Sequence, residues 1–285
     1  MNQFDPKNKT TCHLCGSINT KLFIKELWQC SDCSFCFIPL SKADENKISG
    51  RYISNQVSTV EYYQSLIETE KKNFVERLKL IENFVSPGQL LDVGSNIGTF
   101  SGSAKERGWQ VTAVEPNATA VQISREQGIN TIENFFSANL PELKNRSSFD
   151  CVVMNDVIEH VADPVVMLKD AWQILKASGI VAITTPNIDH PFCRRYQIKP
   201  AEHLVYFNQK TLRVALEKAG FEVLFCQSVS RYRNVAVAAK NPTASFSFPD
   251  KIISSMARAE WINKILAHLL KKIIKDEIFA IGRKV

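Results

Sequence analysis

The sequence has no long apolar run and little net charge of one sign. No stretch of about 18 consecutive apolar residues occurs, which argues against a membrane-spanning helix. The opening MNQFDPKNKTT contains no apolar core, so no secretory signal is expected. The net charge of +6 over 285 residues is too small to favour nucleic acid or an anionic membrane over a solvated surface. We expect a cytoplasmic protein with one α/β domain and a small appendage.

Disulfides are not expected, because eight cysteines in a chain without an export signal indicate thiols or metal ligands. Two CxxC pairs stand near the N-terminus with fourteen residues between them: Cys12, Cys15, Cys30 and Cys33. This spacing is close to that of four-thiolate zinc sites, which stabilise a short fold and carry out no chemistry. Cys36 and His13 are alternative ligands. Residues 1–40 are therefore predicted to form a zinc ribbon with structural Zn²⁺.

The rest of the chain alternates between strand-like and helix-like patterns. Residues 41–60 are polar and aperiodic and are predicted to be a linker before a domain at 61–285. Helices are expected at 67–84, 118–127, 164–176, 211–219 and, as a basic amphipathic insertion, 251–275; strands are expected at 90–92, 111–115, 129–133, 149–155, 179–185, 221–227 and 276–285. This alternation predicts a mainly parallel sheet with helices on both faces.

The stretch LLDVGSNIGTF at 90–100 predicts a strand, a tight turn and the start of a helix. The dinucleotide fingerprint GxGxxG requires a second glycine for the approach of a pyrophosphate, and Asn96 occupies that place. The departure favours a ligand without a pyrophosphate, such as S-adenosylmethionine. Glu115 ends the next strand and suits ribose hydroxyls, although a carboxylate there would also suit NAD.

Three motifs resemble those of class I S-adenosylmethionine-dependent methyltransferases: DVGSNIG at 92–98, VEPN at 114–117 and FDCVVMNDVIEHVADP at 149–164. The resemblance implies a Rossmann-like seven-stranded sheet. It also implies that the methionine end, the ribose and the sulfonium of the donor lie against one set of residues: Asp92, Gly94, Ser95, Asn96, Gly98, Glu115, Pro116, Asn155 and Asp156. Within this set, Glu115 is expected at the ribose and Asn155 and Asp156 near the sulfonium.

Three further segments, GINTIENFF, NDVIEHVAD and PAEHLVYF, resemble zinc-containing sugar and polysaccharide-associated methyltransferases. This implies transfer of a methyl group to a hydroxyl or carbon of a sugar, carried by a nucleotide or a glycan. One alternative is a small-molecule or quinone-type O-methyltransferase at a membrane surface, in peripheral contact with the inner face through 251–275. Another is an RNA-binding or RNA-modifying protein, which is disfavoured because the ribbon lacks a basic patch with interleaved aromatic residues.

The expected general base is His203, oriented by Glu202, because the sugar enzymes carry this pair as their proposed catalytic element. The alternative is that His203 caps or packs against the following helix. His160 is expected to have a structural or donor-side role. Arg194, Arg195 and Lys199 either meet a phosphate of the acceptor or form a solvated loop. Tyr62 and Tyr63 either cover the ligand or pack.

Overall fold

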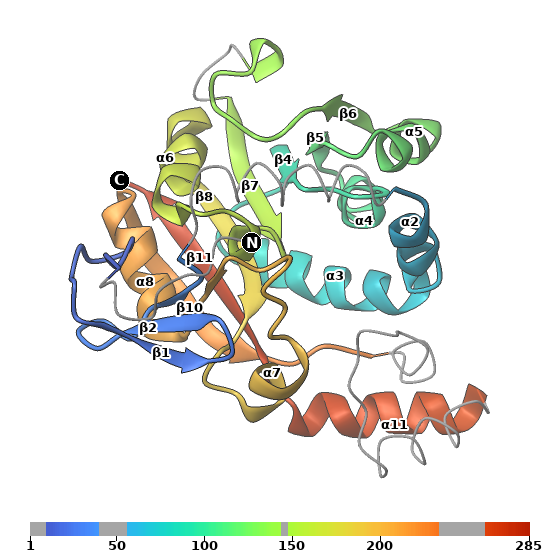
Figure 1. Cartoon of the computed structure of the whole chain (residues 1–285). Helices are drawn as coiled ribbons and strands as arrows, with labels where there is room; N and C mark the ends of the chain where they lie inside the picture. Colours follow the sequence, from blue (N-terminus) through green and yellow to red (C-terminus); the bar gives the residue numbers. More distant parts are fainter. Residues whose placement is uncertain (1–9, 40–55, 144–147, 234–259) are drawn as a thin grey trace.

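The main body of the chain is a seven-stranded mixed sheet with helices on both faces (Figure 1). The structure is a computed structural model and describes residues 10–39, 56–143, 148–233 and 260–285. The strand order is β10-β11-β8-β7-β4-β5-β6, and β11 is antiparallel to both of its neighbours. The other strand pairs of this sheet are parallel. The predicted α/β architecture is confirmed.

The strands of this sheet are β4 (Gln89–Val93), β5 (Gln110–Glu115), β6 (Asn130–Glu133), β7 (Phe149–Asn155), β8 (Leu175–Pro186), β10 (Phe221–Val229) and β11 (Glu277–Lys284). The helices are α2 (Gln56–Gln64), α3 (Ile67–Ile81), α4 (Thr99–Glu106), α5 (Ala118–Glu126), α6 (Pro164–Ile174), α7 (Pro191–Tyr196), α8 (Gln209–Lys218) and α11 (Glu260–Ile273), with the short turns η1 (Pro141–Leu143) and η2 (Ile158–His160).

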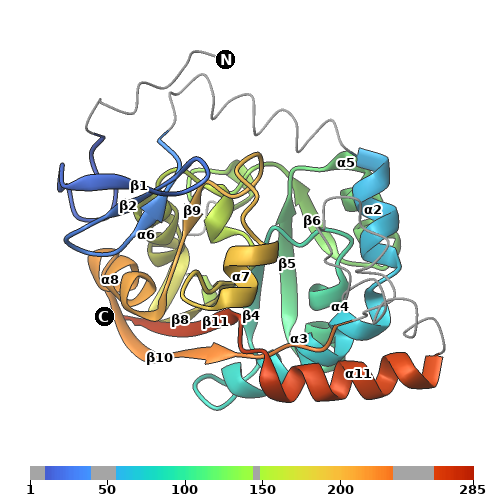
Figure 2. The same cartoon turned by 60° about the horizontal axis from the view of Figure 1, so that its bottom comes forward.

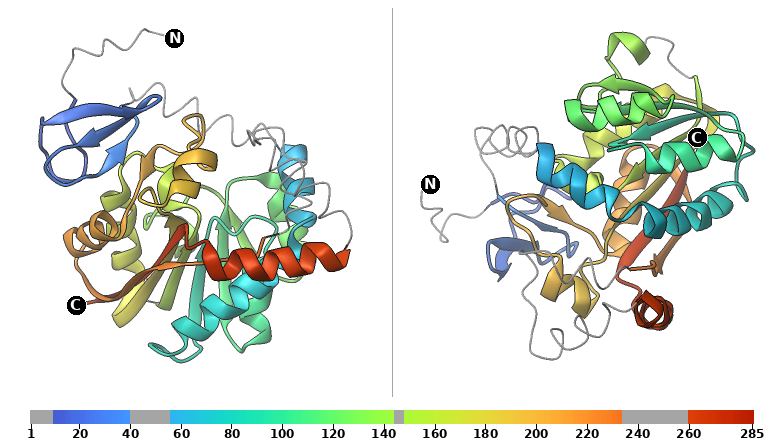
Figure 3. Two further views of the ribbon diagram at one scale, coloured as in Figure 1. Left: turned by 90° about the horizontal axis from the view of Figure 1, so that it is seen from below. Right: turned by 90° about the vertical axis from the view of Figure 1, so that its right-hand side faces the viewer.

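Most boundaries agree with the sequence patterns to within a few residues, and the helix α7 was not expected. The helix α2 begins at Gln56, inside the segment 41–60 predicted as a linker, of which 41–55 lies outside the described residues. The strand β8 begins at Leu175, where a helix was predicted to continue to residue 176. The predicted helix at 251–275 is described only from Glu260, and α11 lies at the outer edge of the molecule next to α3 (Figure 3).

Alternating side chains of the central strands divide the core into two layers. On β7, Cys151 and Val153 pack with α3 and α4, whereas Val152 and Met154 pack with α6 and α8. A strand buried on both faces has an apolar residue at nearly every position, which explains the run CVVM. Ligands of open α/β sheets bind at the carboxyl ends of the parallel strands, and in this protein Val60 of α2 packs against Ile97 in the turn after β4.

The turn between β4 and α4 contains three residues with left-handed backbone. Gly94, Asn96 and Gly98 have φ values of 70°, 49° and 83°. Asparagine tolerates this conformation better than other residues with a Cβ, and its Oδ1 accepts a hydrogen bond from Ile97 N at 2.7 Å. Asn96 therefore adopts the left-handed conformation that a glycine would otherwise provide at this position of the turn.

The N-terminal segment forms a second, four-stranded sheet with order β1-β2-β3-β9 (Figure 2). The first three strands are the ribbon: β1 (Thr20–Ile24), β2 (Leu27–Cys30) and β3 (Cys36–Phe37). The fourth strand, β9 (Val205–Tyr206), belongs to the main domain. Buried ribbon side chains such as Trp28 and Phe35 join the same hydrophobic cluster as α6 and α8. The ribbon thus packs on the main domain as part of one continuous core.

The four predicted zinc ligands converge at one end of the ribbon. The Sγ atoms of Cys12, Cys15, Cys30 and Cys33 all lie within 4.8 Å of one another. Cys36 instead points its thiol toward the carbonyl of Ser34 at 3.6 Å, and His13 Nδ1 donates to the carbonyl of Ala162 at 3.2 Å. Four thiols at this separation fit a tetrahedral Zn²⁺ site. The geometry favours these four ligands over Cys36 or His13.

Replacement of Asn96 tests the left-handed turn. We expect Asn96→Ala to lower the free energy of unfolding by about 1 kcal/mol, because alanine is strained at positive φ. Asn96→Gly loses only the bond to Ile97 N, so its effect should be smaller. Denaturant unfolding followed by circular dichroism measures both, and an alanine variant as stable as the parent would contradict the strain argument.

Metal analysis of serine variants tests the cysteine cluster. Purified protein should contain about one zinc per chain, as one four-thiolate site requires. Cys15→Ser should lose the metal, whereas Cys36→Ser should keep it because that thiol points away from the other four. Inductively coupled plasma mass spectrometry gives the stoichiometry. Zinc retained in Cys15→Ser and lost in Cys36→Ser would assign the site to the alternative ligand set.

Candidate functional site

Asp92 is buried at the carboxyl end of β4 and stabilises the turn that follows it. Its Oδ2 accepts a hydrogen bond from Ser101 Oγ on α4 at 2.6 Å. Burial raises the pKa of Asp92 to about 7, and the hydrogen bond from Ser101 opposes that rise. The aspartate of the sequence motif therefore connects β4 to the first turns of α4, and it carries less than a full charge near neutral pH.

Glu115 joins two neighbouring turns at the same edge of the sheet. One carboxylate oxygen accepts from Asn96 N and the other from Asn117 N, both at 2.9 Å. Asn117 is also the N-cap of α5, and its side chain accepts from Ala120 N. The single carboxylate thus holds the β4–α4 turn and the β5–α5 turn, which includes Pro116, in one arrangement. The structure brings the donor-binding residues predicted from the two motifs together.

Two buried polar atoms near these turns have no hydrogen-bond partner within the described part of the chain. They are Ser95 Oγ, in the β4–α4 turn, and Asn155 Nδ2, at the end of β7. Asn155 Oδ1 accepts from Thr184 Oγ1 on β8 at 3.1 Å, which orients the amide. Buried polar groups are normally satisfied, so an unsatisfied pair at a ligand-binding edge fits a polar ligand such as S-adenosylmethionine.

The glycines of this turn are required by the protein itself. A Cβ at Gly94 would lie 2.5 Å from Val157 Cγ2, and one at Gly98 would lie 2.5 Å from Ile129 Cδ1. Both residues also have positive φ, which disfavours any side chain. Their presence is explained by backbone conformation and packing within the chain.

A second group of polar residues lies beyond β7 and β8. Glu159, His160 and His203 each have a side-chain donor or acceptor atom within 4.8 Å of the others. The two imidazole rings meet edge to face with centroids 4.8 Å apart. Glu159 Oε1 and His203 Nδ1 are buried and have no partner among the described residues. The candidate base therefore lies beside a carboxyl group that the sequence patterns did not single out.

Burial controls the protonation of this group. It raises the pKa of Glu159 well above its ordinary value, and the charge of Asp156 adds to the effect. It lowers the pKa of His203 well below its ordinary value, and His160 and Lys199 add to the effect. We therefore expect a neutral imidazole at His203 with an unprotonated nitrogen, the form that a general base requires.

Glu202 has a different position from the one that an orienting carboxylate would need. Its side chain is about half exposed and lies 3.3 Å from Lys199 Nζ. Its backbone carbonyl accepts from His160 Nδ1 at 2.9 Å. The carboxylate beside His203 is that of Glu159, which stands in the segment NDVIEHVAD next to His160. The motif NDVIEHVAD contains Glu159, but only the fold shows that this side chain lies next to His203.

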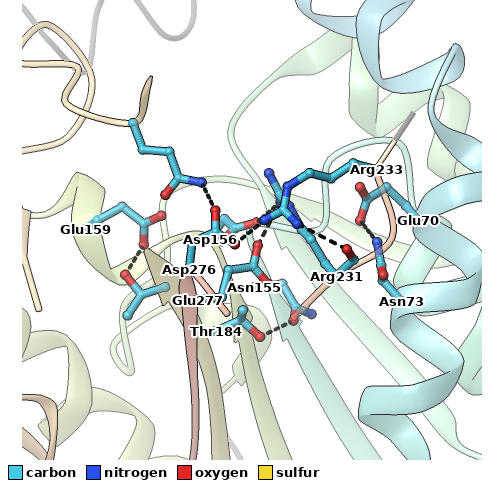
Figure 4. A network of polar contacts seen from close by, with 12 residues as sticks. Glu70, Asn73, Asn155, Asp156, Glu159, Thr184, Arg231, Arg233, Asp276 and Glu277 are labelled. Carbon is cyan, nitrogen blue, oxygen red and sulfur yellow. Dashed lines mark hydrogen bonds and ion pairs between the residues drawn. The ribbon is translucent and has the colours of Figure 1, made fainter. Parts of the chain in front are cut away.

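A network of charged side chains lies along the strand ends near Glu159 (Figure 4). Glu277, buried at the start of β11, pairs with Arg77 on α3 at 2.6 Å and with Arg231 at 2.8 Å. Arg231 also lies 3.7 Å from Asp156. Desolvation and the negative charge of Glu277 raise the pKa of Asp156 to about 6, although Arg231 and Arg77 oppose the rise. No sequence motif predicted these arginines as site residues, because their partners are distant in the chain.

The three cations proposed for an acceptor phosphate have partners within their own loop. Arg194 Nε donates to the Ile188 carbonyl at 2.7 Å. The guanidinium of Arg195 lies over the ring of Tyr196, and Lys199 pairs with Glu202. These contacts favour the solvated-loop interpretation.

Tyr62 and Tyr63 on α2 are partly exposed and meet edge to face with centroids 5.6 Å apart.

Comparisons with known proteins agree with this geometry. A family model described as "Methyltransferase domain" matches residues 63–224. The ubiquinone biosynthesis O-methyltransferase of Rickettsia prowazekii is 32% identical over 117 residues, which are 40% of this chain and 46% of that protein. The corresponding enzyme of Caulobacter vibrioides is 33% identical over 102 residues, 34% of this chain and 40% of that protein. The chain thus spans about half the length of these curated relatives or less.

Two solved structures share the fold over most of the chain. The 1,6-didemethyltoxoflavin-N1-methyltransferase of Burkholderia thailandensis, solved with S-adenosylhomocysteine, aligns with TM-score 0.58 and 15% identity over 94% of this chain and 99% of that chain. A SAM-dependent methyltransferase of Archaeoglobus fulgidus aligns with TM-score 0.53 and 21% identity over 78% of this chain and 99% of that chain. The family model covers more than half of the sequence and its motifs meet at one edge of the sheet, so the chain belongs to the methyltransferase domain family.

Proposed function

We propose that this protein is an S-adenosylmethionine-dependent methyltransferase whose donor lies over the carboxyl ends of β4, β5 and β7. The observation that carries the proposal is the convergence of the β4–α4 turn, Glu115 and Asn155 at that edge in a chain of this family. Ser95 Oγ and Asn155 Nδ2 are the buried groups that the donor would satisfy, and Glu115 is the carboxylate proposed for the ribose. The sulfonium of the bound donor supplies the methyl group.

The proposed acceptor is a hydroxyl group of a small molecule, methylated on oxygen. The curated relatives reported above are named for ubiquinone biosynthesis. These names favour a small-molecule or quinone-type acceptor over the sugar or glycan that the sequence resemblance suggested. The cysteine cluster and the segment PAEHLVYF keep a sugar acceptor as the second candidate. No feature described above favours RNA.

In this proposal His203 would accept the proton of the acceptor hydroxyl, and the bound donor would supply the methyl group by cleavage of its sulfur–methyl bond, which leaves S-adenosylhomocysteine. Its imidazole is buried, burial lowers its pKa, and Nδ1 has no partner among the described residues, so this nitrogen can accept one proton. Glu159 lies beside it with an unpartnered carboxyl oxygen and is proposed to contact the acceptor or the ring. Positioning of the acceptor supplies about 7 to 11 kcal/mol of the barrier reduction in such reactions.

A peripheral membrane contact through α11 would suit an apolar acceptor. The described part of α11 exposes Ile265, Leu269 and Ile273 at helical spacing, and Lys272 and Lys275 are exposed beside them. Such a surface fits the interface of an anionic bilayer. Among the described helices, none has the length and apolar character needed to cross a membrane.

Replacement of Glu115 tests the donor site. We expect Glu115→Gln to weaken S-adenosylmethionine binding about 10- to 100-fold, because charge-assisted hydrogen bonds to a carboxylate contribute about 1.5 to 3 kcal/mol. Glu133→Gln is the matched control, since Glu133 is the register partner of Glu115 on β6 and is half exposed. Isothermal titration calorimetry measures both affinities. Equal binding by the two variants would remove Glu115 from the donor site.

Replacement of His203 tests the acceptor side. We expect His203→Ala to reduce kcat about 100-fold or more while donor affinity is retained, as loss of a general base predicts. His268→Ala, on an exposed position of α11, is the control. Because burial lowers the pKa of His203, turnover of the parent should persist below pH 6.5, and the acid limb should disappear in the variant.

The assay for this experiment uses a radiolabelled methyl donor against phenolic small molecules and nucleotide sugars. Methylation of the phenols alone supports the quinone-type acceptor, and methylation of the nucleotide sugars alone supports the second candidate. Unchanged turnover in His203→Ala would exclude this residue as the base.

A further inference from the structure

The ribbon and the candidate base are parts of one hydrogen-bonded sheet. Register pairs Cys36 with Tyr206 and Phe37 with Val205, and Ile38 N donates to the Leu204 carbonyl at 2.8 Å. His203 is the residue immediately before Leu204. The strand β3, which follows the Cys30–Cys33 knuckle, therefore runs beside the backbone that carries the candidate base.

The other side of this backbone is held by the acceptor-side residues. Leu204 N donates to the carbonyl of Glu159 at 2.7 Å, and Ile188 N donates to the carbonyl of Phe207 at 2.9 Å. The segment 203–207 thus lies between β3 and the loops that follow β7 and β8. A displacement of β3 removes one of the two sets of backbone hydrogen bonds that determine the position of His203.

Side chains reinforce the same connection. Phe35 packs on Phe207 with ring centroids 5.3 Å apart, and both are fully buried. The hydroxyl of Tyr206 accepts from Lys199 N at 2.8 Å, while His203 N donates to the Lys199 carbonyl at 2.8 Å. Tyr206 therefore closes the loop 199–206 around His203, and Cys36 of β3 is its register partner.

The ribbon strands are too short to keep this arrangement by themselves. The strand β3 has two residues and β2 has four. Isolated strands of this length have marginal stability, whereas a tetrahedral ion bound by four cysteines contributes its binding energy directly to folding. The ion would connect Cys12 and Cys15 to Cys30 and Cys33, and so hold the start of β3 on the main domain.

We propose that the metal ion bound by the four cysteines positions the acceptor half of the active site, through the β3–β9 ladder and the backbone of His203. The ligand is a thiolate-preferring divalent ion, Zn²⁺. Donor binding is independent of it, because β4, β5 and the Glu115 carboxylate lie in the other sheet. The cysteines are positioning residues. The inference rests on the proposed function only for the role of His203; the coupling of metal to backbone stands apart from it.

The experiment compares three states of the full chain. The first is loaded with zinc, and the second has had its zinc released by a mercurial. The third is reconstituted with zinc after a thiol has removed the mercurial. Hydrogen exchange of the amides of 204–207 and the imidazole signals of histidine-labelled protein report the position of His203 without any turnover. Calorimetry with S-adenosylhomocysteine reports the donor site. In zinc-free protein we expect exchange at 204–207 to accelerate about tenfold or more and the His203 signal to shift, while donor affinity stays within about twofold.

Variants separate metal loss from a change in β3 itself. Cys33→Ser should reproduce the zinc-free exchange pattern, and Cys36→Ser, in β3 but outside the ligand group, should retain the parent pattern. With an acceptor in hand, zinc release should lower kcat about tenfold or more, and added zinc should restore it.

Two outcomes would overturn the inference. Exchange at 204–207 and the His203 signal that do not respond to zinc would show that the ribbon folds independently of the site. Donor binding lost together with zinc would show global unfolding in place of selective positioning. Absence of turnover in every metal state, with the exchange response intact, would count against the proposed function and would leave the metal coupling supported.

Discussion

The proposed donor half of the site depends on the constraint that the buried carboxylate of Glu115 must have its oxygens satisfied. Glu115 is fully buried, and its two oxygens accept from the backbone of Asn96 and Asn117. A carboxylate without these bonds would be costly to bury, so the two turns and β5 form one cooperative unit. The position of the donor edge relative to the rest of the sheet follows from this unit.

The acceptor side is built on a different principle. Glu159 and His203 are buried with atoms that have no partner in the described part of the chain. Burial disfavours the charged form of each, so the pair can stay neutral until a ligand supplies hydrogen bonds. Arg77, Arg231 and Glu277 lie next to it as a paired charge network that joins α3, β11 and the segment after β10. The Glu115 carboxylate is thus satisfied by backbone N–H groups, whereas Glu159 Oε1 and His203 Nδ1 have no partner among the described residues.

Local sequence patterns correctly predicted the buried strands and the β4–α4 turn, because apolar runs and glycines each indicate one kind of structure there. The buried strands read as apolar runs, and the glycines of the β4–α4 turn have the positive φ that their type indicated. The start of β8 at Leu175 was missed because the pattern LKASG carries no strand signal, and its pairing with β7 decides it. Arg77 and Glu277 are 200 residues apart, so no local pattern could connect them.

The amino-acid sequence by itself determined the alternating α/β order, the donor motifs and the four cysteines, because each depends on residues that are close together in the chain. Only the tertiary structure showed that the carboxyl group beside His203 belongs to Glu159 and not to Glu202, which precedes His203 in the sequence. It also decided that the ribbon continues into the strand next to that histidine. The first fact depends on which side of a loop faces the core. The second depends on hydrogen bonds between segments more than 150 residues apart. Neither arrangement leaves a periodic signal in the sequence.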